Sequence, residues 1–235
     1  MKFAVFAYNF PHWKTQAGLF NLVMNGFIPD VVILQDKKPL NIPISNYRIA
    51  PKDEYLLDPK HVCYGLGLDY WLSDHDTIKI ANPEKDLFGV ILGARILKQR
   101  TIDQFPKGIL NIHPGILPGN RGLDNLKWSL VKGLPVGVTA HFIDSRIDMG
   151  YIVAKEEIKI YDDDTVRDLY LRQRDLQMKV LIDCMKLFAK DGIHLNHYEP
   201  CTPSEKFGIV DEHNDKHLHY HLNRIKLGFN TPVNH

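Results

Sequence analysis

The sequence has few cysteines and no long apolar run. Its three cysteines, Cys63, Cys184 and Cys201, are an odd number at wide spacings. They fit neither a disulfide framework nor a zinc module, so we expect reduced thiols. No stretch approaches the length of a membrane span, and the apolar start at residues 1–8 is too short for a secretory signal. We therefore expect a cytoplasmic protein with no membrane partner.

Neither sign of charge is in excess. The 235 residues include 29 Lys and Arg against 28 Asp and Glu, a formal net charge of +1. This balance gives no electrostatic reason to expect a nucleic-acid partner. At 44% hydrophobic and 24% charged residues, the composition is that of an ordinary globular protein. We expect one main domain over residues 1–195, a tail over 196–235, and a small-molecule ligand.

Glycine is missing where a dinucleotide-binding fold needs it. Residues 2–8 predict a strand and 14–25 a helix, but the turn between them reads Asn9-Phe10-Pro11-His12-Trp13. Without the glycine fingerprint, NAD or FAD is not expected. A second strand is predicted at 31–34, whereas the prolines between residues 42 and 70 indicate irregular structure around short elements.

The rest of the chain predicts an α/β fold. Strands are expected at 87–92, 108–110, 136–143 and 151–160, with a short helix along Leu123, Leu126 and Leu130 that ends at Gly133. The strand at 87–92 is apolar on both faces, as the centre of a parallel sheet requires. A long helix from Val166 stops at Gly192. The expected architecture is Rossmann-like: a mostly parallel sheet with helices on both faces and a short C-terminal appendage.

Two polar clusters have alternative interpretations. Asp162, Asp163 and Asp164 precede the long helix, and we interpret them as a cap, with a metal site as the alternative. His217, His219 and His221 would share a face on a strand and bind a metal there. We favour a solvated tail or a subunit contact, which would make the protein a homodimer. No metal is expected at either cluster.

The stretch from Asn111 to Gly122 is the candidate site. Asn111 and His113 are two residues apart on an extended segment, so their side chains project to the same side. They follow a buried strand, and ligands of open α/β sheets bind beyond the carboxyl ends of the strands. A structural asparagine and a core histidine are the alternative. The small-residue turn that begins at Gly93 exposes backbone groups suited to a flat heterocycle, although a plain strand-to-helix turn is the better interpretation of these residues taken alone.

These motifs resemble the folate-dependent formyltransferases, above all the sugar N-formyltransferases. The resemblance covers residues 80–160 and is carried by Asn111-x-His113-Pro114, the leucine-proline loop, and Asp148-x-Gly150 after Gly137-x-Thr139-x-His141. It implies catalytic roles for Asn111, His113 and Asp148, with 10-formyltetrahydrofolate as co-substrate. The implied pterin-binding residues are Gly93, Ala94, Arg95, Ile96, Leu97, Ile143 and Asp144, within the stretches 93–97 and 143–148.

The implied reaction is attack of an amine on the formyl carbon. Asn111 and His113 would stabilise the developing oxyanion, and Asp148 would orient His113 and hold a water for proton transfer. Whether His113 or Asp148 accepts the proton stays open.

The expected acceptor is a nucleotide-linked 3- or 4-amino-deoxy sugar for surface polysaccharide synthesis. The run Gly119 to Asn125 with Trp128 resembles the sugar-nucleotide enzymes, which implies substrate contacts by Asn120, Arg121 and Trp128. Arg121 would reach a phosphate or pin the loop, and Trp128 would stack on a ligand ring or pack against a neighbouring element. Because the tail is short, tRNA is not expected. Glycinamide ribonucleotide transformylase and a catalytically silent folate- or nucleotide-binding protein are the alternatives.

Overall fold

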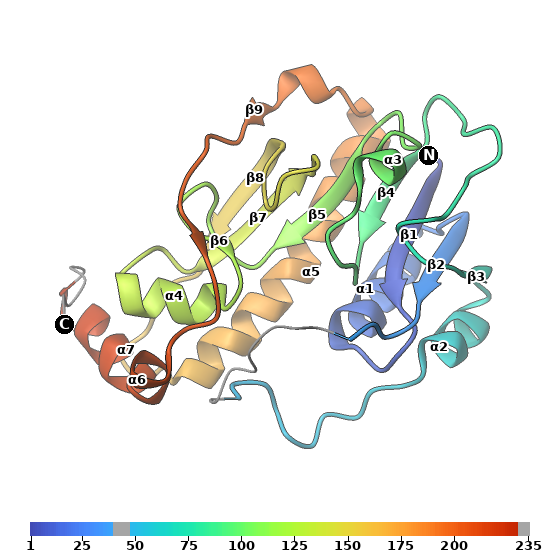
Figure 1. The fold of residues 1–235 in the computed structure, drawn as a ribbon. Helices are drawn as coiled ribbons and strands as arrows, with labels where there is room; N and C mark the ends of the chain where they lie inside the picture. Colours follow the sequence, from blue (N-terminus) through green and yellow to red (C-terminus); the bar gives the residue numbers. More distant parts are fainter. Residues whose placement is uncertain (40–47, 230–235) are drawn as a thin grey trace.

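An eight-stranded sheet forms the centre of the computed structural model, which describes residues 1–39 and 48–229 (Figure 1). Its strands are β1 (Phe3–Tyr8), β2 (Val31–Gln35), β3 (Tyr70–Leu72), β4 (Phe88–Ile91), β5 (Ile109–His113), β7 (Gly137–Phe142), β8 (Tyr151–Glu157) and β9 (Glu199–Pro200). Their order is β3-β2-β1-β4-β5-β7-β8-β9. Neighbours from β3 to β5 are parallel, whereas β7, β8 and β9 each pair antiparallel. The expected Rossmann-like, mostly parallel sheet is confirmed.

Helices cover both faces of this sheet, as predicted. On one face lie α1 (Trp13–Met24), α2 (Pro59–Leu66) and α5 (Val166–Asp191), which share a core with Phe3, Val5 and Ala7. The alternate residues Ala4 and Phe6 pack on the other face, with α3 (Gln99–Ile102). This alternation makes β1 apolar on both sides and therefore central. Within the described ranges, no helix has the length and apolarity needed to cross a membrane.

Irregular structure around short elements was expected between residues 42 and 70. Residues 42–47 lie outside the described residues, and the remainder contains the short helix α2, which Asp58 caps ahead of Pro59. One local prediction needs correction. The cap of α5 is Thr165, whose hydroxyl and backbone N–H form a capping box with Asp168. Asp164 instead accepts from the N–H of Tyr161 and pairs with Arg172.

The histidine-rich tail is helical. Asp211 caps α6 (Glu212–Lys216), and α7 (Leu218–Lys226) follows. Residues two apart on a helix point about 200° apart, so His219 and His221 do not share a face as they would on a strand. Leu218 and Leu222 are buried against α4 (Asn125–Lys132). Residues 230–235 lie outside the described part of the tail.

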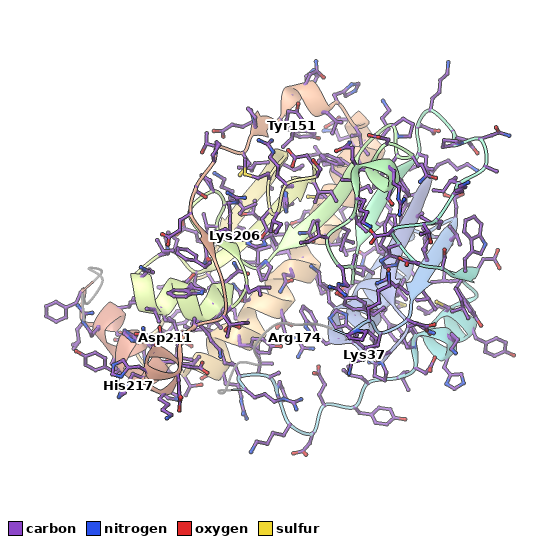
Figure 2. The ribbon with its side chains drawn as sticks, viewed as in Figure 1. Lys37, Tyr151, Arg174, Lys206, Asp211 and His217 are labelled. Carbon is purple, nitrogen blue, oxygen red and sulfur yellow. The ribbon has the colours of Figure 1, made fainter. Side chains whose placement is uncertain are left out.

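A C-terminal segment returns over the loop that follows β5. Here β10 (Lys206–Phe207) pairs in parallel with β6 (Arg121–Gly122), and Figure 2 shows Lys206 on this segment in front of the sheet. Gly122 has φ 103°, and a Cβ there would lie 2.0 Å from the carbonyl oxygen of Phe207. Only glycine permits this close approach between the C-terminal segment and the loop that follows β5.

Candidate active site

The site lies at the C-terminal edge of the parallel strands. The chain continues from β1 to β2 on one side and from β4 to β5 on the other, so the strand order reverses between β1 and β4. A crevice forms at such a switch point because the connections on its two sides lead away from each other. A cleft of about 810 Å³ opens here. It is lined by Asn111, the turn 94–97, most of the loop 143–148 and the C-terminal residues 206–208.

His113 is fixed between two oxygen acceptors. Its Nε2 lies 2.8 Å from the carbonyl oxygen of Asn120, and its Nδ1 lies 3.4 Å from Oδ1 of Asp148. A carbonyl oxygen only accepts, so Nε2 carries a proton. The ring is 3% exposed and does not line the cleft, whereas Asp148 does. The imidazole therefore contacts the Asp148 carboxylate from the side away from the cleft.

Asp148 is presented by a left-handed turn. Its φ is 48°, and Gly150 follows at φ 102°, where a Cβ would lie 2.0 Å from the carbonyl oxygen of Phe142. Burial opposes ionisation of this carboxyl group. Hydrogen bonds from His113 and from the N–H of Gly122, at 2.8 Å, outweigh burial and hold the pKa of Asp148 below its ordinary value. A carboxylate thus faces the cleft at neutral pH.

Asn111 is oriented by a second histidine. Register between β5 and β7 places Asn111 opposite His141, and Nδ2 of Asn111 lies 3.2 Å from Nε2 of His141. Nδ1 of His141 lies 3.0 Å from the carbonyl oxygen of Met149 and must donate to it. Nε2 is consequently the acceptor. Burial, with the charge of His113, lowers the pKa of His141 to about 4. Asn111 keeps a second Nδ2–H for the cleft.

The loop after β5 holds His113 in place. Thr139 donates its hydroxyl to the carbonyl oxygen of Gly115 at 2.7 Å and accepts from the N–H of Leu117 at 3.0 Å. A Cβ on Gly115 would lie 2.8 Å from the carbonyl oxygen of Asn120 and 3.0 Å from Nε2 of His113. The absence of a side chain at residue 115 lets the backbone pass over the imidazole.

The stretches that the resemblance implied for a pterin form opposite walls of the cleft. Ala94, Arg95, Ile96 and Leu97 line one wall, and Ile143 and Asp144 line the other. Gly93 does not line the cleft. It packs against Tyr8, because a Cβ at residue 93 would lie 2.8 Å from the Tyr8 ring. The hydroxyl of Tyr8 donates to the carbonyl oxygen of Ala94 at 2.8 Å, which fixes the turn.

The three residues implied to bind the acceptor do not line the cleft. Asn120 is 1% exposed and bonds to Asn125 and Ser129. Arg121 donates to the carbonyl oxygens of Ile147 and Ser204 at 2.6 and 2.8 Å, so it pins the loop. Trp128 stacks on Phe207 with ring centroids 5.0 Å apart. These side chains therefore pack around the site without reaching the cleft.

Some site residues carried no local signal in the sequence. His141 appeared only as part of a strand motif, and its contact with Asn111 depends on strand register. Lys206 and Phe207 reach the cleft from a tail interpreted as an appendage. A parallel pairing between a two-residue strand and a loop has no sequence pattern by which to find it.

Residues 77–185 match the model of the formyl transferase family. Over these residues the chain resembles a formyl transferase domain. Asn111, His113 and Asp148 all lie within the matched residues, as the resemblance implied. The match also contains both walls of the cleft, whereas β1, α1 and the C-terminal segment lie outside it.

Known formyltransferases resemble this chain in sequence and in fold. A methionyl-tRNA formyltransferase of Acetivibrio thermocellus is 33% identical over 111 residues, which is 47% of this chain and 35% of that protein. The chain spans between a third and a half of the length of such curated relatives.

Two solved structures share the fold over most of their length. An N-formyltransferase of Helicobacter canadensis, in complex with folinic acid and dTDP-3-aminofucose, has TM-score 0.61 at 18% identity, covering 100% of this chain and 84% of its own. Phosphoribosylglycinamide formyltransferase of Anaplasma phagocytophilum has TM-score 0.61 at 17% identity, covering 90% and 100%.

Proposed function

We propose that this protein transfers a formyl group from 10-formyltetrahydrofolate to the amine of a nucleotide-linked amino-deoxy sugar. The observation that carries the proposal is the meeting of Asn111 and Asp148 at one cleft, with His113 3.4 Å behind the carboxylate. A ligand-binding module needs a cleft, but it has no need of an amide and an ionised carboxylate that face one cleft, with an imidazole against the carboxylate.

The cleft fits the folate donor. Its volume of about 810 Å³ lies within the range of small-molecule sites. Ile91, Leu97 and Ile143 supply apolar wall for a flat ring, and the backbone of residues 94–97 supplies polar groups beside it. The folinic acid complex of the H. canadensis enzyme supports this assignment. Bound 10-formyltetrahydrofolate supplies the formyl group.

Asn111, Asp148 and His113 stabilise the developing charge and transfer the proton. The second Nδ2–H of Asn111 donates to the formyl oxygen as negative charge develops there, an interaction worth about a hundred- to a thousand-fold in rate. Asp148 and His113 act as a coupled pair that takes the proton of the attacking amine. A bond forms between the amine nitrogen and the formyl carbon, the bond from that carbon to N10 breaks, and the proton passes through the pair to N10.

Similar structures and sequences support three candidate acceptors. The H. canadensis neighbour carries an amino sugar on a nucleotide, and its chain spans all of this one. The A. phagocytophilum neighbour makes glycinamide ribonucleotide the second candidate, since its TM-score is equal. Sequence relatives add methionyl-tRNA as a third, with identity confined to about half of this chain.

Release of tetrahydrofolate tests the proposal. The protein is incubated with 10-formyltetrahydrofolate and, separately, dTDP- and UDP-linked 3- and 4-amino sugars, glycinamide ribonucleotide and methionyl-tRNA. We expect turnover with one amino sugar at a kcat/KM well above that for the other classes, and its loss in His113→Ala and Asp148→Asn. Turnover confined to glycinamide ribonucleotide or to methionyl-tRNA would reassign the acceptor. A protein inert toward every amine would be a silent folate-binding module.

A further inference from the structure

Lys14 brings an ammonium group to the residues of the active site from outside the matched domain. It lies in the first turn of α1, and its Nζ donates to the carbonyl oxygen of Ile112 at 2.5 Å. Ile112 is the residue between Asn111 and His113. The side chain therefore bridges the switch point and binds the strand end that carries both groups.

Lys14 lies outside the cleft, on the other face of the sheet. The cleft opens on the face of the sheet that α3 covers, and α1 lies on the other face. Lys14 does not line the cleft and is partly exposed. If the folate occupies the cleft, the acceptor amine must reach the formyl carbon from a side that the folate leaves open. Lys14 stands on the α1 face, which a folate in the cleft would not cover.

The charge of Lys14 is not neutralised by a direct partner. Within the described part of the chain, Lys14 forms no ion pair with a carboxylate inside 4.0 Å. Burial lowers the pKa of Lys14 to about 8, and the more distant Asp148 partly offsets that effect. The ammonium is therefore present below about pH 8, where an amine substrate is itself mainly protonated.

We propose that Lys14 is a positioning residue that disfavours the protonated form of the acceptor amine beside Asp148. This inference rests on the proposed formyl transfer. A carboxylate alone would stabilise an incoming ammonium, which has no lone pair for attack. A second positive charge on the same side counters that stabilisation, because like charges disfavour each other's charged forms. At an effective dielectric constant near 20, repulsion between two like charges within about 10 Å of each other is large enough to move a pKa by about one unit.

The test compares Lys14→Met with Lys14→Arg, which keeps the charge, and with Lys60→Met in the first turn of α2 as the matched control. We expect the acidic limb of the kcat profile to move up by about one pH unit in Lys14→Met, so that kcat falls about tenfold at low pH and converges with the wild type at high pH. Lys14→Arg and Lys60→Met should keep the wild-type limb. A uniform loss of kcat at every pH in Lys14→Met would overturn the inference and leave a merely structural lysine.

Other titrating groups near Lys14 must be followed in the same samples. Lys14 interacts electrostatically with His12 before α1, His141 on β7 and Asp148 in the loop 143–148. His113 on β5 acts on His141, and Arg174 on α5, whose guanidinium lies over the ring of Trp13, acts on His12.

A readout in the free protein separates this inference from the proposed function. Lys14 is one of the charges that lower the pKa of His12 and of His141. Imidazole NMR should therefore show both histidines titrating at higher pH in Lys14→Met than in the wild type. Unchanged titrations would overturn the charge placement even if the enzyme is active. Shifted titrations in a protein inert toward all amines would instead reject the formyl transfer on which the inference depends.

Discussion

Asn111 donates its side-chain amide to a histidine that is held neutral by burial, His141, at 3.2 Å. His141 in turn donates to the carbonyl oxygen of Met149, which belongs to the turn that presents Asp148. One buried imidazole thus connects the group proposed to stabilise the oxyanion with the turn that supplies the carboxylate. The orientation of Asn111 depends on a residue that does not touch the cleft.

Replacing His141 should misorient Asn111. We expect kcat of His141→Ala to fall about tenfold to a hundredfold, because loss of a positioned donor weakens oxyanion stabilisation without removing it. KM for the folate should change little, since His141 does not line the cleft. Steady-state kinetics with Asn111→Ala and the double variant provide the check. Fully additive effects in that cycle would show that His141 does not act through Asn111.

Stability should fall as the pH drops from 6.5 to 4. His141 has a folded-state pKa of about 4 against an ordinary value of 6.5, so the unfolded chain binds the proton first and unfolding is favoured across that window. The shift corresponds to about 3 kcal/mol. His12 and His75, whose pKa values burial also lowers, add to the slope. Asp148 contributes only below about pH 4, because its pKa is depressed.

Urea titrations at pH 7 and pH 4.5 measure this slope. The variant His141→Gln keeps a hydrogen-bonding side chain and removes the titrating ring. It should be less stable than the wild type at pH 7 but lose less stability on acidification. An equal loss in both proteins would rule out His141 as a source of the acid sensitivity.

Glycine at residue 115 should be required for activity. In Gly115→Ala the new Cβ would lie 3.0 Å from Nε2 of His113 and closer still to the carbonyl oxygen that this nitrogen binds. We expect at least a tenfold fall in kcat and a stability loss of about 1–3 kcal/mol. Gly119→Ala is the matched control in the same loop, because its Cβ would meet only the carbonyl oxygen of Ile116, at 3.8 Å. Similar kinetics for the two variants would contradict the prediction.

Arg121 should determine how firmly the folate is held. Its guanidinium joins the carbonyl oxygen of Ile147, in the wall of the cleft, to that of Ser204 in the C-terminal segment. Arg121→Ala should raise KM for the folate about tenfold, with a smaller effect on kcat, since the wall loses both contacts. Lysine lacks the planar set of donors, so Arg121→Lys should not restore KM. Arg167→Ala, on the exposed surface of α5, should match the wild type.

The sequence by itself determined the α/β class and the pairing of Asn111 with His113. Both follow from local rules: strands buried on both faces are apolar at every position, and residues two apart on a strand share a side. The same holds for α5, whose end at Gly192 was predicted. Its cap was assigned wrongly to the aspartates because Asp162, Asp163 and Asp164 stand directly before Thr165, and Asp and Thr side chains both serve as caps.

Only the tertiary structure decided which residues surround Asn111 and His113. Asp148 lies 35 positions beyond His113 and reaches it because β7 runs antiparallel beside β5, and His141 meets Asn111 because of the register between those strands. Lys14 and the C-terminal segment come from opposite ends of the chain. Their contacts depend on the order of strands in the sheet and on one glycine that lets two backbones approach. Such long-range relations leave no periodic pattern in a single sequence, since they are set by how elements pack rather than by which elements form.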